Sequence, residues 1–240
     1  MLLPHPTLWQ IGFFKLTSHG LFFALGAEAA GIMLTRQAQK RGLDAAKVWP
    51  LLIRVFAAGL IGARVLFMIL YPQAAGGWSQ LFDIWHGGLV SYGGLLTGFL
   101  TALACVHQFP KAQRSAWYDI ITVATLTGWG IGRIGNFLAG DSIGVISQFW
   151  SDTYQRIPIQ LFESIACFAL VYYLLTRQWR DGQVALIGAI GYFGSRFLID
   201  SWRDENKYFV LHTSQWVSLL LLIILLCYAR SRRYYSSNFI

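Results

Sequence analysis

VWPLLIRVFAAGLIGARVLFMILY, residues 48–71, is a long apolar run in which only Arg54 and Arg64 carry charge. An α-helix needs about 20 largely apolar residues to cross the hydrocarbon core of a bilayer, so the run predicts a membrane-spanning helix. The whole chain agrees, because 55% of its 240 residues are hydrophobic and only 12% are charged. Soluble domains carry roughly 25% charged residues. The composition therefore excludes a disordered chain and a disulfide scaffold, and it predicts an integral membrane protein.

Six further stretches have the same apolar character. The first follows a segment that lacks the basic start of a signal peptide, so we expect it to stay as a permanent helix. The sequence predicts an all-α membrane protein, residues 1–240 forming a single integral membrane domain. Its seven expected transmembrane helices are 17–34, 48–71, 88–107, 117–138, 158–176, 184–200 and 210–229.

The positive charges divide unequally between the two sides of this arrangement. Basic connections stay in the cytoplasm, which predicts an outside N-terminus and a cytoplasmic C-terminus. The net charge of +8 is then a signal of topology and of attraction to anionic lipid, and we expect no nucleic-acid partner. One side carries eleven basic residues, Arg36, Lys40, Arg41, Lys47, Lys111, Arg114, Arg177, Arg180, Arg230, Arg232 and Arg233, and the other carries four, Lys15, Arg156, Arg203 and Lys207.

Eight charged residues fall within the expected spans or at their edges. A charge in a bilayer costs several kcal/mol unless it is paired or hydrated, so these residues indicate a polar cavity inside the bundle. The alternative is that they pair with one another and only join helices, and Arg54 could simply extend to the cytoplasmic surface. The eight are Arg54, Arg64, Arg133, Arg196, Glu28, Asp119, Glu163 and Asp200.

The stretch GWGIGRIGNFLAGDSIG, residues 128–144, has the most distinctive polar pattern. Arg133, Asn136 and Gly140 recur at three- and four-residue spacing, which places them on one helical face. A guanidinium beside an amide and exposed backbone suits a phosphate group. Plain helix packing would explain the glycines but not Arg133 and Asn136, so the stretch predicts an anion site.

Three other patterns accompany it. Tyr192, Arg196 and Asp200 lie on one helical stripe, either as part of a site or as a structural ion pair. The segment 158–163, PIQLFE, begins a helix with proline in its first turn and puts Gln160 and Glu163 on one face. The segment 87–94, GGLVSYGG, is expected to be a loop whose backbone can wrap a ligand, with Tyr92 and His86 as its functional groups.

Taken in order, these motifs resemble the prolipoprotein diacylglyceryl transferase family. The best match is GRIGNFLAGD, residues 132–141, together with Gly144. Further matches are residues 62–64, 87–94, 158–163 and 192–200, with Asp119 and Gln215, so the resemblance runs from about residue 19 to residue 216. It implies a seven-helix membrane protein with an outward N-terminus in the bacterial cytoplasmic (inner) membrane, its active site facing the outer (periplasmic) side.

The resemblance also implies the reaction and its partners. Family members transfer a diacylglyceryl group from phosphatidylglycerol, a membrane lipid, to the lipobox cysteine thiol of a preprolipoprotein; glycerol phosphate leaves and a thioether forms. We expect no cofactor and no metal, since the histidines lack ligand spacing with carboxylates. The candidate catalytic residues are Arg133, Arg196, His19 and Tyr92, and the candidate substrate-binding residues are Arg133, Asn136, Asp141, Gly144, Tyr192, Gly93, Gly94, Arg64, Glu163 and Asp200.

Two positions depart from the family pattern. Tyr92 stands where the family usually has histidine, and His19 stands where it usually has tyrosine. Either His19 supplies the imidazole from a neighbouring helix, or the chain is a relative with altered or lost activity. His19, His86 and Tyr92 are the candidate bases for the thiol proton. A lipid transporter is a further alternative, although the chain lacks the repeats common in transporters.

Overall fold

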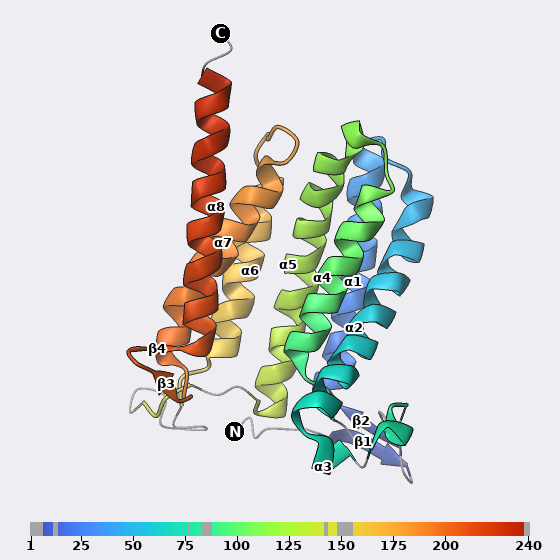
Figure 1. Ribbon diagram of the computed structural model, residues 1–240, viewed down its shortest axis with the longest axis vertical. Coiled ribbons are helices and arrows are strands. Elements are labelled where there is room, and N and C mark those ends of the chain that lie inside the picture. The colour runs from blue at the N-terminus through green and yellow to red at the C-terminus, as the bar shows by residue number, and fades with distance from the viewer. Residues whose placement is uncertain are drawn as a thin grey trace. The chain divides into compact units, whose positions relative to one another are not determined.

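The computed structural model describes residues 7–11, 14–75, 77–82, 88–141, 144–147 and 156–237; at 11, 14, 15, 74, 75 and 232–237 it describes the backbone only. Helices make up most of this part of the chain (Figure 1). A short helix, α3 (Pro72–Ala75), follows the second long one. The long helices are α1 (Ser18–Lys40), α2 (Val48–Leu70), α4 (Ser91–His107), α5 (Arg114–Ala139), α6 (Ile159–Leu175), α7 (Gln183–Ile199) and α8 (Thr213–Ser237).

Each of the seven expected spans coincides with one of these long helices. Three of the helical stretches, Ala45–Leu70, Gln183–Trp202 and Thr213–Ser231, are long and apolar enough to cross a membrane. The helices α4 and α6 are apolar but shorter. The protein is thus a largely helical integral membrane protein, and α1 and α8 extend beyond the spans expected from the sequence.

Two antiparallel strand pairs interrupt the helical pattern, which the all-α prediction did not include. The strands β1 (Thr7–Ile11) and β2 (Phe14–Thr17) pair just before α1. The strands β3 (Lys207–Tyr208) and β4 (Leu211–His212) pair between α7 and α8. Such short pairs carry no long apolar run, so hydropathy does not reveal them.

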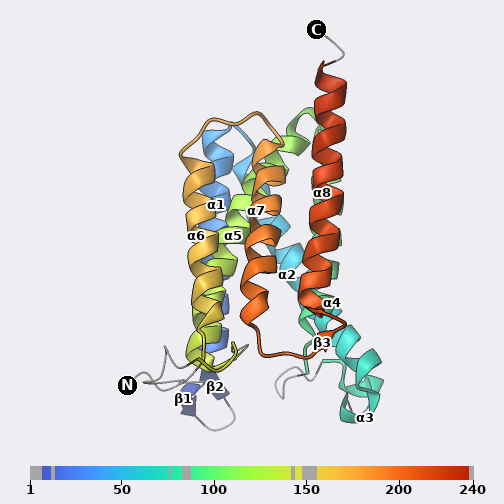
Figure 2. The same ribbon diagram turned by 90° about the vertical axis from the view of Figure 1, so that its left-hand side faces the viewer.

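The described chain forms two compact units. The first unit is Met1–Leu34 with Tyr118–Ile240, and the second unit is Thr35–Trp117. In the first unit α7 lies between α6 and α8 (Figure 2). Glycines bring α1 and α5 into contact, since a Cβ on Gly26 would lie 2.5 Å from the Gly128 carbonyl oxygen. Its apolar core consists of Val123, Leu126, Cys167, Val171, Leu174 and Val184.

Asp119 is one of the charged residues that the sequence places inside a span. Its side chain is fully buried on α5 and accepts hydrogen bonds from the backbone amides of Gly182, at 2.9 Å, and Ala185, at 2.8 Å. These amides lie at the start of α7, where four N–H groups have no partner within the helix. Asp119 therefore caps α7 and fixes this helix against α5.

In the second unit α2 and α4 pack closely in antiparallel directions. A Cβ on Gly62 would lie 2.1 Å from Thr97 Oγ1, and a Cβ on Gly93 would lie 2.3 Å from the Gly62 carbonyl oxygen. The Thr97 hydroxyl also lies within hydrogen-bond distance, 2.9 Å, of the Ala58 carbonyl oxygen on the facing helix. Larger side chains at these glycines would force the two helices apart.

Candidate functional site

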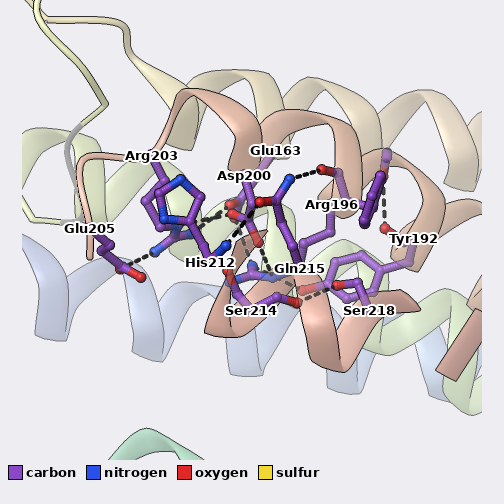
Figure 3. Close-up of polar contacts among 12 residues, drawn as sticks. Glu163, Tyr192, Arg196, Asp200, Arg203, Glu205, His212, Ser214, Gln215 and Ser218 are labelled. Carbon is purple, nitrogen blue, oxygen red and sulfur yellow. Dashed lines mark hydrogen bonds and ion pairs between the residues drawn. The ribbon is translucent and has the colours of Figure 1, made fainter. Parts of the chain in front are cut away.

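Glu163 is the centre of a buried group of charges in the first unit. It lies in the first turns of α6 and forms an ion pair with Arg133 of α5. Arg196 Nη1 on α7 lies 3.3 Å from Glu163 Oε2, and Arg203 Nη2 lies 3.2 Å from Oε1 (Figure 3). One carboxylate thus receives three guanidiniums that arrive from separate parts of the chain.

Asp200 is the second buried acid of this group. It follows the end of α7 and is fully buried. Its Oδ1 accepts from Arg203 Nε at 2.9 Å, and its Oδ2 lies 3.4 Å from Arg196 Nε. Asp200, Glu163 and the three arginines Arg133, Arg196 and Arg203 are hereafter the charged cluster.

The charged cluster has more positive than negative charge. Three guanidiniums face two buried carboxylates, and the third acid, Glu205, is about half exposed where it meets Arg203. Within the described residues, Arg133 Nη2 is buried and has no hydrogen-bond partner. A buried N–H donor without an acceptor is unfavourable, so an anion that supplies oxygen acceptors would be stabilised here.

Arg203 completes the cluster, and the sequence reasoning missed it. Its side chain is only 7% exposed, although we expected a charge on an external connection. Burial by itself would lower the pKa of its guanidinium, but Asp200, Glu205 and Glu163 raise that pKa above its ordinary value. Arg203 is therefore charged at physiological pH. Its three-residue spacing from Asp200 was the available signal.

Uncharged polar groups surround the charged cluster. The Tyr192 hydroxyl accepts from Arg196 Nη1 at 3.4 Å, one turn along α7. Ser164 donates to the Gly130 carbonyl oxygen at 2.8 Å and so joins α6 to α5. Gln160 donates to the Asp141 carbonyl oxygen just after α5. The last two bonds hold α5 and α6 together beside the charges.

Asn136 links Arg133 to the start of α1. With its amide assigned in the orientation that satisfies both neighbours, its oxygen accepts from Arg133 Nη1 at 2.8 Å and its nitrogen donates to His19 Nδ1 at 2.8 Å. Asp141 Oδ2 lies 3.9 Å from the same His19 nitrogen. His19 and Asp141 are both more than half exposed. The predicted residues Arg133, Asn136, Asp141 and His19 are thus brought together.

Gly144 has a packing role in the structure. Its amide donates to the Ile157 carbonyl oxygen at 3.2 Å, and a Cβ there would lie 2.6 Å from that oxygen. It also forms an isolated β-bridge with Arg203. Gly144 therefore lets the connection after α5 close over the backbone of Arg203. Its predicted substrate contact stays a prediction.

Arg64 and its surroundings lie in the second unit. The guanidinium is buried and donates to the carbonyl oxygens of Gln80 at 2.7 Å, Leu81 at 3.2 Å and Gly88 at 3.1 Å. It also lies over the Phe67 ring, 5.5 Å from the centroid. In the structure Arg64 holds the connection between α2 and α4, and its predicted substrate contact stays a prediction.

The segment 87–94 is only partly a loop. Helix α4 begins at Ser91, so Tyr92, Gly93 and Gly94 are helical, which corrects the expected ligand-wrapping loop. Gly93 packs against α2, and Gly94 faces the Gly59 carbonyl oxygen. Tyr92 is exposed in the first turn of α4. His86 and Gly87 lie outside the described residues.

The site has the donor groups of an anion site. Guanidiniums and an amide donate hydrogen bonds in fixed directions, which suits phosphate oxygens. Within the ranges that the structure describes, no three His, Cys, Asp or Glu side chains gather as metal ligands do. The donors of this site can stabilise an anion electrostatically.

Comparison with known proteins connects this geometry to a family. The family model described as prolipoprotein diacylglyceryl transferase matches residues 6–230. A phosphatidylglycerol–prolipoprotein diacylglyceryl transferase from Streptococcus mutans is 27% identical over 239 residues, covering 92% of both chains. The protein of the same name from Streptococcus uberis is 29% identical over 249 residues, covering 95% of both chains. The chain is therefore a transferase that belongs to the prolipoprotein diacylglyceryl transferase family.

Proposed function

We propose that this protein transfers a diacylglyceryl group from phosphatidylglycerol to the lipobox cysteine thiol of a preprolipoprotein. The observation that carries the proposal is the charged cluster with its surplus positive charge, adjoining Asn136 and His19. The names of the relatives supply the two substrates. The cluster supplies what the phosphate of such a lipid requires.

The reaction exchanges one bond for another. The thiolate sulfur attacks the glycerol carbon that carries the phosphate, so a C–S bond forms as the C–O bond breaks. Glycerol phosphate leaves with the electron pair of that bond, and the thiol proton passes to a base. The protein has to stabilise negative charge on the departing phosphate and position the sulfur behind the carbon.

Arg133 and Arg196 are the proposed phosphate ligands. Both guanidiniums contact Oε2 of Glu163, so they lie on the same side of this carboxylate. Their planar forks match phosphate oxygens in a way that an ammonium does not. Asn136 accepts from Arg133 and orients its guanidinium. Charge developing on the leaving oxygen is thereby offset where it appears.

His19 is the proposed base for the thiol. Because the Asn136 amide donates to Nδ1, the neutral ring carries its proton on Nε2. Nδ1 takes the thiol proton once this hydrogen bond is released. The Asp141 carboxylate lies 3.9 Å from Nδ1. Tyr92 is proposed to act with His19, as the exchange of the two residue types suggests, and His86 is the alternative base.

We further propose that all seven long helices cross the membrane, with the N-terminus outside and the C-terminus in the cytoplasm. In the first unit the site residues lie near helix ends. His19 is at the start of α1 and Glu163 is at the start of α6. Arg133 is near the end of α5 and Arg196 is near the end of α7. Alternating helix directions put these ends on one side. Since the basic connections join the opposite ends, the site faces outward from the bacterial cytoplasmic membrane.

Cysteine labelling tests this topology. A membrane-impermeant thiol reagent added outside intact cells should label Ser79→Cys, and it should leave Ala112→Cys and Gln178→Cys unlabelled until the cells are opened. All three positions are exposed to solvent in the structure. Labelling of the second pair in intact cells would place the site on the cytoplasmic face.

Labelled phosphatidylglycerol and a lipobox peptide test the activity. The purified protein in lipid vesicles should join label to peptide through a thioether and release glycerol phosphate. Binding of lipid and peptide without turnover would support the inactive relative. Movement of labelled lipid between leaflets with an unmodified peptide would support the transporter.

A further inference from the structure

Arg54 is one of the charged residues of the spans that the proposed reaction does not use. It lies on α2, six residues beyond Val48, so about 9 Å of helix separate it from that end. The residue is exposed on the helix surface. A lipid-facing arginine at this depth is costly unless an anion or water meets it.

An open pocket of about 650 Å³ lies beside Arg54 in the second unit. Polar side chains, Arg54, Thr101 and Gln108, line it together with the apolar Leu100, Ala104 and Cys105. Among the described residues, none of the three polar side chains has a hydrogen-bond or ion-pair partner. Arg54 and Gln108 are exposed and Thr101 is half-buried, so all three can reach a ligand at this pocket.

The helix pair itself brings these groups together. Thr101, Ala104, Cys105 and Gln108 stand at positions i, i+3, i+4 and i+7, which places them on one face of α4 and of the C-cap residue that follows it. Gly98 of α4 lies beside Val55 of α2, since a Cβ on Gly98 would lie 3.6 Å from Val55 Cγ1. Arg54 therefore stands opposite the Thr101 turn of the neighbouring helix.

We propose that Arg54, Thr101 and Gln108 bind the phosphate of an anionic phospholipid on the cytoplasmic leaflet, separately from the outward-facing site. The leaflet assignment rests on the proposed topology. The guanidinium pairs with the phosphate, while the hydroxyl and the amide donate to its remaining oxygens. The apolar lining receives the first carbons of the lipid.

The charge of the second unit favours an anionic ligand. Residues 35–117 contain eight basic side chains and only two acidic ones, Asp44 and Asp83. Asp44 already pairs with Lys47 at 3.5 Å, and Lys47 lies over the Phe109 ring next to Gln108. The pocket thus adjoins a basic cytoplasmic end of the hairpin, where anionic headgroups concentrate.

Native mass spectrometry of the full-length protein, released from nanodiscs, tests this proposal. Nanodiscs present both leaflets, so the lipid count does not depend on topology. Nanodiscs containing phosphatidylserine, which is not the proposed substrate, are compared with phosphatidylcholine nanodiscs, and inorganic phosphate is added in a separate arm. The variants are Arg54→Gln, Thr101→Val and Gln108→Ala, with Arg36→Gln as the matched control because Arg36 is also exposed and basic.

The expected result is one phosphatidylserine fewer on Arg54→Gln than on the wild type and on Arg36→Gln, with apparent affinity about fivefold weaker. Thr101→Val and Gln108→Ala should weaken retention without a change of charge, and phosphate should not displace the lipid.

Equal retention by Arg54→Gln and Arg36→Gln, or by phosphatidylcholine nanodiscs, would overturn the site. An effect of Arg54→Gln alone would mean that Arg54 only extends to the surface. Transferase activity is measured separately, so its absence in the wild type would count against the proposed function and not against this site.

Discussion

Arg203 Nη2 and Glu163 Oε1 lie 3.2 Å apart, and this ion pair joins the segment after α7 to the first turns of α6. Both side chains are buried. Arg203 also holds Asp200, so it connects the two acids of the charged cluster. Arg133 pairs with Glu163, and Arg196 pairs with both acids. Their positions therefore depend on Arg203, which belongs to neither α5 nor α7.

Arg203→Gln should destabilise the protein and lower its activity together. Removing one partner of a buried ion pair costs about 3–5 kcal/mol, because the remaining carboxylates stay buried without compensation. The thermal unfolding midpoint of the purified protein should fall, and turnover per folded molecule should fall as well. Lys207→Gln is the control, since Lys207 is exposed on β3. If both variants behave like the wild type, Arg203 does not organise the cluster.

Arg64→Gln should loosen the connection between α2 and α4. The three backbone carbonyls that Arg64 holds would lose charge-assisted bonds, each with a net value of about 1.5–3 kcal/mol. We expect faster proteolysis within residues 77–90 and a lower unfolding midpoint. Arg64→Lys should restore only part of the loss, because an ammonium does not reach three carbonyls in a plane. Unchanged proteolysis in Arg64→Gln would contradict this role.

Gly128→Ala should separate α1 from α5. The added Cβ would lie 2.7 Å from the Gly26 carbonyl oxygen, which belongs to backbone and does not move aside easily. Overpacking of this kind costs about 1–3 kcal/mol, measured as a lower unfolding midpoint. Gly194→Ala is the matched control, since a Cβ there meets no atom within 4 Å. Equal stability of the two variants would argue against a close helix contact at Gly128.

The sequence predicts the helices better than the roles of the charges. Apolar length alone located the seven long helices, because a bilayer demands it. Asp119 and Arg64 were marked as costly charges, but their partners are backbone groups that become neighbours only on folding. The sequence predicts Arg203 on an external connection, because hydropathy does not show that the segment after α7 folds back against the first turns of α6. The glycines at 93 and 94 suggested a loop, whereas close packing against α2 explains them.

His19→Ala should abolish lipidation while the amount of folded protein stays the same. The imidazole is exposed, so its loss leaves no buried cavity, yet it removes the base that faces Asn136. The double variant His19→Tyr with Tyr92→His should retain activity, since it restores the usual family arrangement, and the single substitutions should be non-additive. Lipidation by His19→Ala at the wild-type rate would transfer the role of base to another residue.

The central claim is that Arg133 and Arg196 act as planar phosphate ligands and not merely as positive charges. The most direct measurement is turnover of labelled phosphatidylglycerol onto a lipobox peptide by Arg133→Lys and Arg196→Lys, at equal amounts of folded protein in vesicles. We predict that each variant loses about 100-fold or more in turnover, because the charge remains but the bidentate geometry is lost, while Arg36→Lys behaves like the wild type. Wild-type turnover in either lysine variant would contradict the phosphate role of that arginine.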